Sequence, residues 1–515
     1  MKKDVNVLPQ SPELLEKIIA DLRRELEAEK AEKISYKERY VRLLEELRLA
    51  KYQRFSSSSE KNILQQDLFD EAGIELPEEL QDQLEEDIEN DKKPKKKHPV
   101  RRPLPKELPR EVIVHDIAED EKKCQCGACL VRIGEEITEQ LKYIPAQLSV
   151  VQHVRPKYAC KPCAENIKIA SLPMLLLPKC IATPELVAYT IVAKYADHIP
   201  LYRQQAIWSR LDIDLPRSSL CGWVLKVAEL CEPLISCLQQ KIIEYDYTQA
   251  DETPVQVLHE VGRDNQTKSY MWVYRGGGEK PCIVYDYQPT RGGVHAEKFL
   301  TEFKGYLQTD AYSGYHFAAN HASITQVGCM AHARRKFADI LKIAKTNGLA
   351  TEALKFIRQL YAIEKVASEK NMSVEERYHY RQEKSVPLLT AYKQWLDTHL
   401  TKTSEQAKIG NAIRYSLSNW NALNNYLKDG RIEIDNNLAE NAIRPFALGR
   451  KNWLFQGSPK GAKAGATFYS LIETCKANNV EPYRYFCAML QRIRFCKSLE
   501  DYQALLPQFI QLPSI

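Results

Sequence analysis

Residues 435–457 carry the side chains best suited to chemistry on a nucleic acid. The stretch opens with an aspartate and two asparagines, which favour a helix N-cap, and predicts a helix with Glu440 and Arg444 on one face. Pro445 is expected to end this helix before a basic, aromatic segment at residues 450–453. A carboxylate beside cations and a stacking surface is what metal-assisted chemistry on a phosphate backbone requires. Taken alone, the stretch is better explained as a capped surface helix with one ion pair.

Two aspartates upstream lie on candidate β-strands. The sequence predicts three strands, a helix and a fourth, short strand, at residues 243–258, 269–275, 282–287, 295–303 and 305–310. The first strand carries Asp251 and the last ends in Asp310. This is the order of a ribonuclease-H-like fold, whose first and fourth strands are neighbours, so the two aspartates would converge and could hold two Mg²⁺ ions. Singly, each aspartate is more often a turn former, and Asp246, Glu252 and Asp286 stay open as alternatives.

A basic group follows where a further strand is expected to run into a helix. The sequence from Val327 to Phe337 includes His332, Arg334 and Arg335. The histidine could contact a phosphate or a catalytic carboxylate, and the arginines suit a DNA backbone. A helix-capping histidine and a solvated basic face explain these residues at least as well in isolation. Residues 338–430 are helical in pattern and too long for the bare fold, so they are interpreted as an inserted helical subdomain.

Five cysteines have the spacing of a zinc site. Three lie close together and two follow after a strand-like segment: Cys124, Cys126, Cys129, Cys160 and Cys163. Thiolate pairs on tight turns supply the tetrahedral sulfur set that Zn²⁺ prefers, and a four-thiolate site is structural because it leaves no open position. Four of the five are expected to bind, with Cys124 and Cys129 competing for one place. A redox pair or plain buried thiols are the alternatives.

A mainly helical region is predicted at residues 183–240. Within it, a helix over residues 202–211 is followed by a short turn and a second helix that starts at Arg217. With Arg217, Ser218 and Ser219 at its N-terminus, the pair resembles a helix-turn-helix, although any helical hairpin has the same pattern. DNA recognition and a plain helical hairpin therefore stay equally open.

The N-terminal residues have the spacing of a coiled coil. Apolar residues recur at alternating steps of four and three, at Leu15, Ile19, Leu22, Leu26, Tyr36, Tyr40, Leu43 and Leu47. This seam predicts a self-association helix, with an amphipathic helix packed on its own chain as the alternative. An acid-rich and then strongly basic stretch follows and predicts a flexible charged linker.

The composition is that of a soluble chain with several domains. Its 515 residues are too many for one core, and 44% hydrophobic with 27% charged residues is an ordinary balance. The net charge of +5 hides a local basic patch after residue 91. No long apolar run predicts a membrane span and no signal core follows the first methionine, so the 14 cysteines indicate reduced thiols or metal ligands. We expect a cytoplasmic protein.

A series of motifs runs along the chain. The longest are Gln249-Ala-Asp251-Glu252-Thr-Pro, Leu307-Gln-Thr-Asp310-Ala-Tyr, Cys329-Met-Ala-His332-Ala-Arg and Asp435-Asn-Asn-Leu-Ala-Glu440-Asn-Ala-Ile-Arg444-Pro, and residues 154–160, 194–204 and 449–457 add to them. In this order they resemble the DDE transposases of the insertion sequence 66 family over essentially the whole chain. The resemblance implies that Asp251, Asp310 and Glu440 form the catalytic, metal-binding triad. The first cysteine group departs from the Cys-x-x-Cys-Gly of many relatives, and Ala311 stands where Gly is frequent.

The activity implied by the resemblance is that of a DNA transposase. Two Mg²⁺ or Mn²⁺ ions at the triad would support cleavage at transposon ends and transfer of the freed 3′-hydroxyl into target DNA. The residues expected to contact DNA are Arg217, Ser218, Ser219, His332, Arg334, Arg335, Arg444, Arg450 and Lys451. The coiled coil would pair at least two protomers on DNA, small accessory proteins of the same element are implied as partners, and the protein would act on the bacterial nucleoid. The alternatives are a ribonuclease-H-like nuclease that cuts without joining and a zinc-containing DNA-binding protein with a lapsed catalytic centre.

The expected fold class is multidomain α+β. The expected parts are a coiled-coil helix (1–61), a charged linker (62–103), a zinc-binding β module (104–175), a helix-turn-helix-like DNA-binding region (176–242), a ribonuclease-H-like core in two parts (243–337 and 431–475), its helical insertion (338–430) and a C-terminal helical element (476–515).

Overall fold

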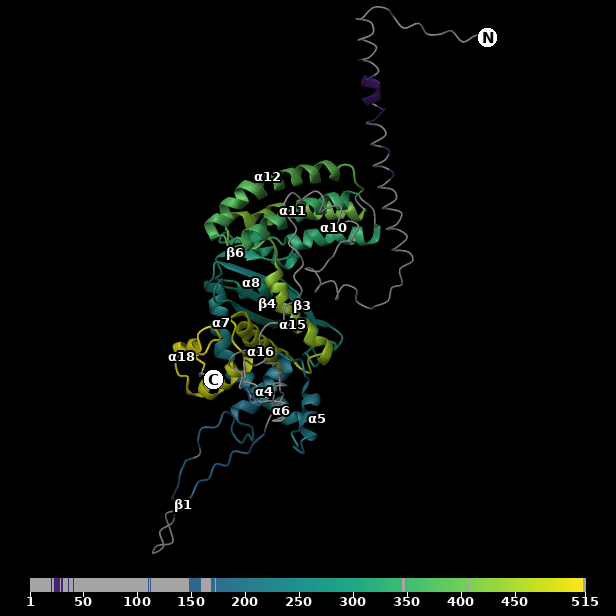
Figure 1. The fold of residues 1–515 in the computed structure, drawn as a ribbon. Coiled ribbons are helices and arrows are strands. Elements are labelled where there is room, and N and C mark those ends of the chain that lie inside the picture. The colour runs from purple at the N-terminus through teal and green to yellow at the C-terminus, as the bar shows by residue number, and fades with distance from the viewer. Residues whose placement is uncertain are drawn as a thin grey trace, which may run out of the picture. The chain divides into compact units, whose positions relative to one another are not determined.

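The computed structural model describes residues 148–158, 168–171, 173–344, 348–404 and 407–512, together with isolated positions before residue 113. The chain divides into two compact units, one of residues 75–173 and one that contains residues 174–515. In the smaller unit, the described strands β1 (Lys157–Tyr158) and β2 (Lys168–Ile169) pair antiparallel. The larger unit carries all the other elements labelled in Figure 1.

Several predicted features lie outside the described residues. They are the charged linker, most of the coiled coil and the cysteine cluster of Cys124, Cys126, Cys129, Cys160 and Cys163. The described positions between residues 20 and 40 are helical. Three seam residues are among them, and Leu26, Tyr36 and Tyr40 are all exposed.

A mixed sheet of five strands lies in the middle of the larger unit, in the order β5-β4-β3-β6-β7. Its strands are β3 (Tyr247–Gln256), β4 (Lys268–Gly276), β5 (Cys282–Gln288), β6 (Gly305–Gln308) and β7 (Ile324–Val327). β3, β4 and β5 are antiparallel neighbours, whereas β6 and β7 run parallel to β3. The first and fourth strands are therefore paired, as the sequence predicts. The expected helix between β5 and β6 is α8 (Val294–Phe299).

Helices cover the sheet and close its edge. The apolar runs of β4 and β5 are almost wholly buried because α15 packs on β3 and β4, while α7 and α16 pack on β5. α16 (Pro459–Ala477) begins at a Ser458 cap followed by proline, a sequence that favours a helix start. Its Ser470 and Thr474 hydroxyls accept hydrogen bonds from the Tyr285 and Ile283 amides, at 2.8 and 3.0 Å. Edge strand β5 therefore does not present these amides to another chain.

A group of helices follows β7 and lies at one end of this unit (Figure 1). Its members are α10 (Met330–Ala344), α11 (Leu349–Glu369), α12 (Val374–Leu400), α13 (Lys408–Ser418) and α14 (Trp420–Asn424). α12 begins with a capping box, in which Ser373 and Glu376 bond each other's backbone amides. α10 runs across residue 338, where the sequence predicts the start of a helical insertion.

A buried arginine ties these helices to the segment that leads into α15. The Arg381 guanidinium is fully buried and donates to both carboxylate oxygens of Glu364, at 2.8 and 2.7 Å. It also donates to the carbonyls of Tyr426, Asp429 and Ile432, at 2.9, 2.9 and 2.8 Å. One side chain thus donates hydrogen bonds to a carboxylate, which Arg377 also contacts, and to three carbonyls.

A second helical group, with α4 and α6, lies at the other end of the unit (Figure 1). It comprises α4 (Pro184–Tyr195), α5 (Leu201–Ser209), α6 (Arg217–Leu230), α7 (Glu232–Glu244), α17 (Pro482–Arg492) and α18 (Leu499–Ala504). The predicted helical pair of residues 202–211 and 217 onward is confirmed in α5 and α6. No helix in the described part of the chain has the length and apolar character needed to cross a membrane.

α15 (Asn437–Trp453) corrects one expectation, because the helix continues through Pro445. Proline removes one backbone donor and crowds the preceding turn. The nearby carbonyl of Ala442 accepts a hydrogen bond from the Tyr285 hydroxyl, and Asn441 is open to solvent. Buried Phe446 holds the second half of the helix against the core. The prediction that Pro445 ends the helix is therefore wrong, and Glu440 lies on the same helix as the basic segment.

Candidate active site

β3 and β6 carry matching pairs of glutamine and aspartate. Gln249 and Gln308 lie directly opposite each other in the parallel pairing of the two strands. Asp251 lies two residues beyond Gln249, and Asp310 lies two residues beyond Gln308. Because strand residues two apart share a face, Asp251 lies on the same face of β3 as Gln249. The pairing therefore places both aspartates just beyond the paired segment, with Asp251 in the middle of β3 and Asp310 after the end of β6.

The two glutamines form the centre of a buried amide network. Nε2 of Gln249 donates to Oε1 of Gln308 at 2.8 Å, and the Tyr247 hydroxyl donates to the same oxygen at 2.6 Å. Nε2 of Gln308 donates to the carbonyl of Glu433 at 2.9 Å. Both glutamine side chains are buried. The network fixes β3, β6 and the segment before α15 relative to one another.

Gln249 and Asn436 also dock the first turn of α15 on β3. Oε1 of Gln249 accepts from the amide of Ala439 at 3.0 Å, and Nδ2 of Asn436 donates to the carbonyl of Ala250 at 3.0 Å. The far end of the helix returns to β3 as well, where the amide of Gln456 donates to the carbonyl of Gln256 at 2.9 Å. Glu440 follows Ala439 and is therefore held beside Asp251.

The three acidic residues of the predicted triad influence one another electrostatically. Burial, followed by the charge of Glu252, raises the pKa of Asp251 well above its usual range. Glu440 and Asp310 contribute further to this increase. Burial also raises the pKa of Glu440; His332 and Arg335 oppose the rise, and Asp310 adds to it. The structure thus places Asp251, Asp310 and Glu440 near enough for their charges to act on one another, although their ligand atoms do not all lie within 4.8 Å of one another.

Asp310 follows the end of β6 in a turn. Its Oδ1 accepts a hydrogen bond from the amide of Tyr312 at 2.9 Å, an arrangement typical of aspartate after a strand. This bond orients one carboxylate oxygen toward its own turn. The side chain is only partly buried, which distinguishes it from Glu440.

Glu252 is a fourth carboxylate beside the cluster. Arg291 donates to its Oε1 at 2.6 Å, and the Tyr315 hydroxyl donates to its Oε2 at 2.7 Å. Burial, followed by the charge of Asp310, raises the pKa of Glu252 to about 7, although Arg291 opposes the rise. The Arg291 guanidinium lies 3.8 Å from the centre of the Tyr312 ring. Glu252 therefore belongs to the acidic cluster but has partners of its own.

The other two acidic alternatives have partners elsewhere. Asp246 precedes β3 and forms a 2.8 Å ion pair with Arg431 on the surface. Asp286, on β5, accepts a hydrogen bond from Gln288 at 2.7 Å. Neither contributes to the pKa of Asp251.

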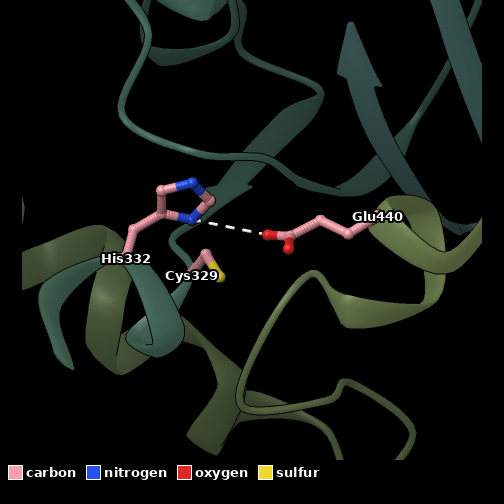
Figure 2. Close-up of side chains that lie close together, drawn as sticks. All are labelled: Cys329, His332 and Glu440. Atoms are coloured by element: carbon pink, nitrogen blue, oxygen red, sulfur yellow. Dashed lines mark ion pairs between the residues drawn. The ribbon is translucent and has the colours of Figure 1, made fainter. Parts of the chain in front are cut away.

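His332 and Arg335, on the first turns of α10, face Glu440. Nδ1 of His332 lies 3.6 Å from Oε1 of Glu440, and an Arg335 Nη lies 4.0 Å from Oε2. Figure 2 shows the His332 ring and the Glu440 carboxylate directed toward each other, with the Cys329 thiol beside them. Cys329 immediately precedes α10, and its Sγ accepts from the amide of Asn436 at 3.2 Å.

The remaining predicted DNA contacts differ in their surroundings. Arg450 donates to the carbonyl of Pro254 on β3 and is partly buried, so the structure gives it a role in holding the sheet. Lys451 is exposed on the last turn of α15. Arg334 and Arg444 are both partly buried. Of the basic residues on α15, Lys451 is thus the one fully open to solvent.

The N-terminus of α6 borders a groove of about 560 Å³ between α5 and α6. Arg217 and Ser218 are exposed and line the groove, and Ser219 is partly buried. The backbone amide of Arg217 donates to the side chain of Gln205 on α5 at 3.2 Å, which fixes the turn between the helices. The Arg217 side chain remains accessible to a ligand.

A divalent cation fits the acidic cluster. Carboxylate oxygens are the ligands that Mg²⁺ and Mn²⁺ prefer. Oε1 of Glu440 is buried and accepts no hydrogen bond from the described residues. A cation would offset the burial and the like charges that raise the pKa of Asp251. The donor set and its charge therefore suit Asp251, Asp310 and Glu440 as ligands.

Three residues that the sequence analysis did not single out contribute to this site. Gln249 and Gln308 build the amide network, and Cys329 lies beside Glu440. The repeated Gln-x-Asp pattern at both aspartates was the available signal for the glutamines. The approach of Cys329 to a residue more than a hundred positions away has no local signature.

Comparisons with protein families cover most of the chain. The model described as "Transposase IS66 family" matches residues 179–464, and "IS66 C-terminal element" matches residues 470–508. "Zinc-finger binding domain of transposase IS66" matches residues 121–164, which include all five clustered cysteines. "Transposase C of IS166 homeodomain" matches residues 42–113.

Curated relatives are found in Sinorhizobium fredii (strain NBRC 101917 / NGR234). The uncharacterized protein y4qI is 34% identical over 408 residues, which cover 76% of this chain and 75% of the relative. The uncharacterized protein y4jD is 33% identical over 390 residues, or 73% of this chain and 76% of the relative. The family models and these relatives define the class of protein as a transposase. Within that class, the chain belongs to the IS66 transposase family.

Proposed function

We propose that this transposase cleaves phosphodiester bonds at the ends of its insertion sequence and joins the freed 3′-hydroxyls to target DNA. Asp251, Asp310 and Glu440 are the catalytic triad of this proposal. The observation that supports it is the approach of three acidic side chains, which the β3–β6 pairing and the docking of α15 on β3 bring near one another. Such a cluster is destabilising without a cation, so its presence in a transposase favours a catalytic role.

The sheet is proposed to be a ribonuclease-H-like core. Its order, with three antiparallel strands followed by two strands parallel to the first, supports this assignment. The helices from α11 to α14 are then an insertion between Asp310 and Glu440. Arg381 supports Glu440 indirectly, because it holds the carbonyls of the segment that enters α15.

Mg²⁺ or Mn²⁺ ions at the triad would supply Lewis acidity and lower the pKa of an attacking water. The chain's own contribution is positioning. Asp251 lies on a central strand fixed by the glutamine network, and Glu440 lies on a helix docked at both ends. Arg335 and His332 border Glu440 and supply donors for a phosphate oxygen. No nucleophilic side chain is required, since water and a DNA hydroxyl are the attacking groups.

Other parts of the chain are proposed to assemble the complex. The zinc module and the groove at Arg217 would recognise the ends, and exposed Lys451 would hold the DNA backbone. The exposed seam residues Leu26, Tyr36 and Tyr40 suit a coiled coil that pairs two protomers. The accessory proteins implied by the resemblance would join this complex.

The test is cleavage of linear DNA that carries the inverted repeats flanking the gene, with Mg²⁺ or Mn²⁺. Asp251→Asn, Asp310→Asn and Glu440→Gln should each reduce cleavage at least roughly 100-fold and leave DNA binding in gel-shift assays intact. Asp246→Asn is the matched control, because this aspartate adjoins the same strand but pairs on the surface, and it should cleave like the wild type.

Pre-cleaved ends separate transposition from simple cutting. The proposal expects them to be joined to a target plasmid in a triad-dependent reaction. Cleavage without joining would identify a nuclease, and binding without either reaction would identify a DNA-binding protein. Cleavage that persists in Asp251→Asn would refute the triad.

A further inference from the structure

Cys329, His332 and Glu440 form a compact group of three different donors (Figure 2). One ligand atom of each lies within 4.8 Å of the others, and the group is the one of its kind among the described residues. Cys329 and Glu440 are 2% and 7% exposed, and His332 is partly buried. The group adjoins the acidic cluster and shares Glu440 with it.

Two atoms in this group lack hydrogen-bond partners among the described residues. Oε1 of Glu440 and Nδ1 of His332 are buried and face each other at 3.6 Å, without the hydrogen bond that would satisfy both. Buried polar atoms normally have hydrogen-bond partners. Two such atoms without partners, beside a thiol, therefore point to a missing ligand. A cation that both atoms and the thiol can bind would satisfy all three at once.

The donor set selects the class of cation. A thiolate, an imidazole and a carboxylate suit Zn²⁺ and other thiophilic ions, whereas Mg²⁺ takes oxygen ligands. Zinc lies about 2.0–2.3 Å from such donors, which places neighbouring ligands closer together than 4.8 Å, so the side chains would contract around the ion. The amide of Asn436 donates to Sγ of Cys329 and would remain to orient the thiolate.

We propose that Cys329, His332 and Glu440 form a binding site for Zn²⁺ or a similar thiophilic divalent ion, and that its occupancy inhibits the transposase. On binding, the Cys329 thiol releases its proton to solvent and its sulfur coordinates the ion, with the fourth position left to water. The ion takes the Glu440 carboxylate and neutralises its charge, so Glu440 no longer serves the two aspartates. This inhibitory consequence rests on the proposed function, whereas the binding site itself does not.

Zinc content of the full-length protein tests the site. Wild type and Cys329→Ser are dialysed against the same buffered series of free Zn²⁺, and bound zinc per chain is measured by atomic emission. Wild type should hold one zinc more per chain than Cys329→Ser, because the predicted zinc module is unchanged in both. Cys475→Ser, which alters another buried cysteine on α16, is the matched control and should retain the wild-type content.

Zinc inhibition is measured in the same proteins, each relative to its own Mg²⁺-dependent cleavage without zinc. Cys329→Ser should require roughly tenfold more zinc than wild type for half-inhibition. If cleavage is absent in wild type but the extra zinc is present, the proposed function fails and the site stands. If cleavage is present but zinc content is equal in folded wild type and Cys329→Ser, the site is refuted.

Anomalous diffraction gives a readout that does not depend on any variant. Crystals of the wild type exposed to zinc should show a peak between the Cys329 sulfur, the His332 ring and the Glu440 carboxylate. A peak bound by Glu440 and the aspartates, without Cys329, would overturn the assignment.

Discussion

Asp251 is partly buried among like charges, and this has a consequence for stability. Its pKa is raised, so the folded protein binds the proton more tightly than the unfolded chain does. The stability of the cation-free protein therefore falls as pH rises from the usual aspartate range through the raised pKa. The charge of the Asp251 carboxylate therefore opposes folding of the cation-free protein.

Asp251→Asn should accordingly stabilise the cation-free protein while it removes activity. At pH 8 without Mg²⁺, we expect the free energy of unfolding to rise by about 1–3 kcal/mol, because a buried carboxylate charge is replaced by a neutral amide. Urea denaturation at pH 5 and pH 8 measures the effect, which should be smaller at pH 5. A variant that is less stable than wild type at pH 8 would contradict this account of the cluster.

The junction of β3, β6 and α15 depends on the two glutamines. Gln249→Leu should reduce cleavage roughly 10–100-fold because Asp251 and Glu440 lose their common support. It should also cost about 1–3 kcal/mol of stability, since the amides paired with Gln249 are left unsatisfied. DNA affinity should be unchanged, which gel-shift titration beside single-turnover cleavage can measure.

Gln256→Leu is the matched control for the glutamine prediction. Gln256 ends the same strand and is exposed, and its side-chain amide nitrogen donates to the carbonyl of Asn265. Its substitution should leave the cleavage rate near that of wild type. An equal loss of cleavage activity in Gln249→Leu and Gln256→Leu would mean that β3 tolerates neither substitution and that the amide network has no special role.

Arg381 supports the group of helices from α10 to α14 through buried hydrogen bonds, as the glutamines support the junction of β3, β6 and α15. Arg381→Met should cost about 3–5 kcal/mol, because the Glu364 carboxylate and three carbonyls lose their buried donor. Lys384→Met, an exposed change on the same helix, should have little effect. Chemical denaturation of the three proteins at pH 7 makes the comparison.

The loss of stability in Arg381→Met should depend on pH in a defined direction. Burial tends to raise the pKa of Glu364, but Arg381 and then Arg377 lower it below its usual value. An acid whose pKa is lower in the folded than in the unfolded state stabilises the fold at pH values above its unfolded-state pKa. This stabilisation is lost as the pH falls through the folded-state pKa. The difference between wild type and Arg381→Met should therefore shrink at acidic pH, and a difference that grows there would exclude the ion pair as its cause.

Sequence patterns predicted the elements better than the contacts between them. The strands that carry Asp251 and Asp310 were predictable from local apolar runs, and their pairing followed from the order of elements. The continuation of α15 through Pro445 was not, because the contacts around it involve residues that are distant in sequence, such as Tyr285 on β5. The role of Cys329 was not predictable either, since Asn436 and Glu440 lie more than a hundred residues away from it in the sequence.

At the scale of the whole molecule, the acidic site lies entirely within residues 174–515. This part belongs to one compact unit, whereas the zinc-finger match at residues 121–164 lies in the other. A fragment of residues 174–515 should therefore unfold cooperatively and show triad-dependent nicking with Mn²⁺. Its affinity for the terminal repeats should fall at least roughly tenfold relative to the full chain.

Calorimetry measures whether the fragment unfolds cooperatively, and competition binding with unrelated DNA measures its affinity for the terminal repeats. A fragment that does not fold would show that the N-terminal regions stabilise the sheet. A fragment that still selects the terminal repeats would instead place end recognition in the helices around Arg217.

α16 closes the edge of β5 and joins the core late in the chain, which matters during synthesis on the ribosome. Roughly 150 residues separate the last strand from the end of α16, and at about 5–20 residues per second the sheet waits for many seconds before its covering helix emerges. During that interval the β5 amides and the apolar face beneath α16 are open to other chains. Nascent copies made close together on one message are therefore prone to mispairing, and a chaperone that shields the β5 edge should raise the yield of active enzyme.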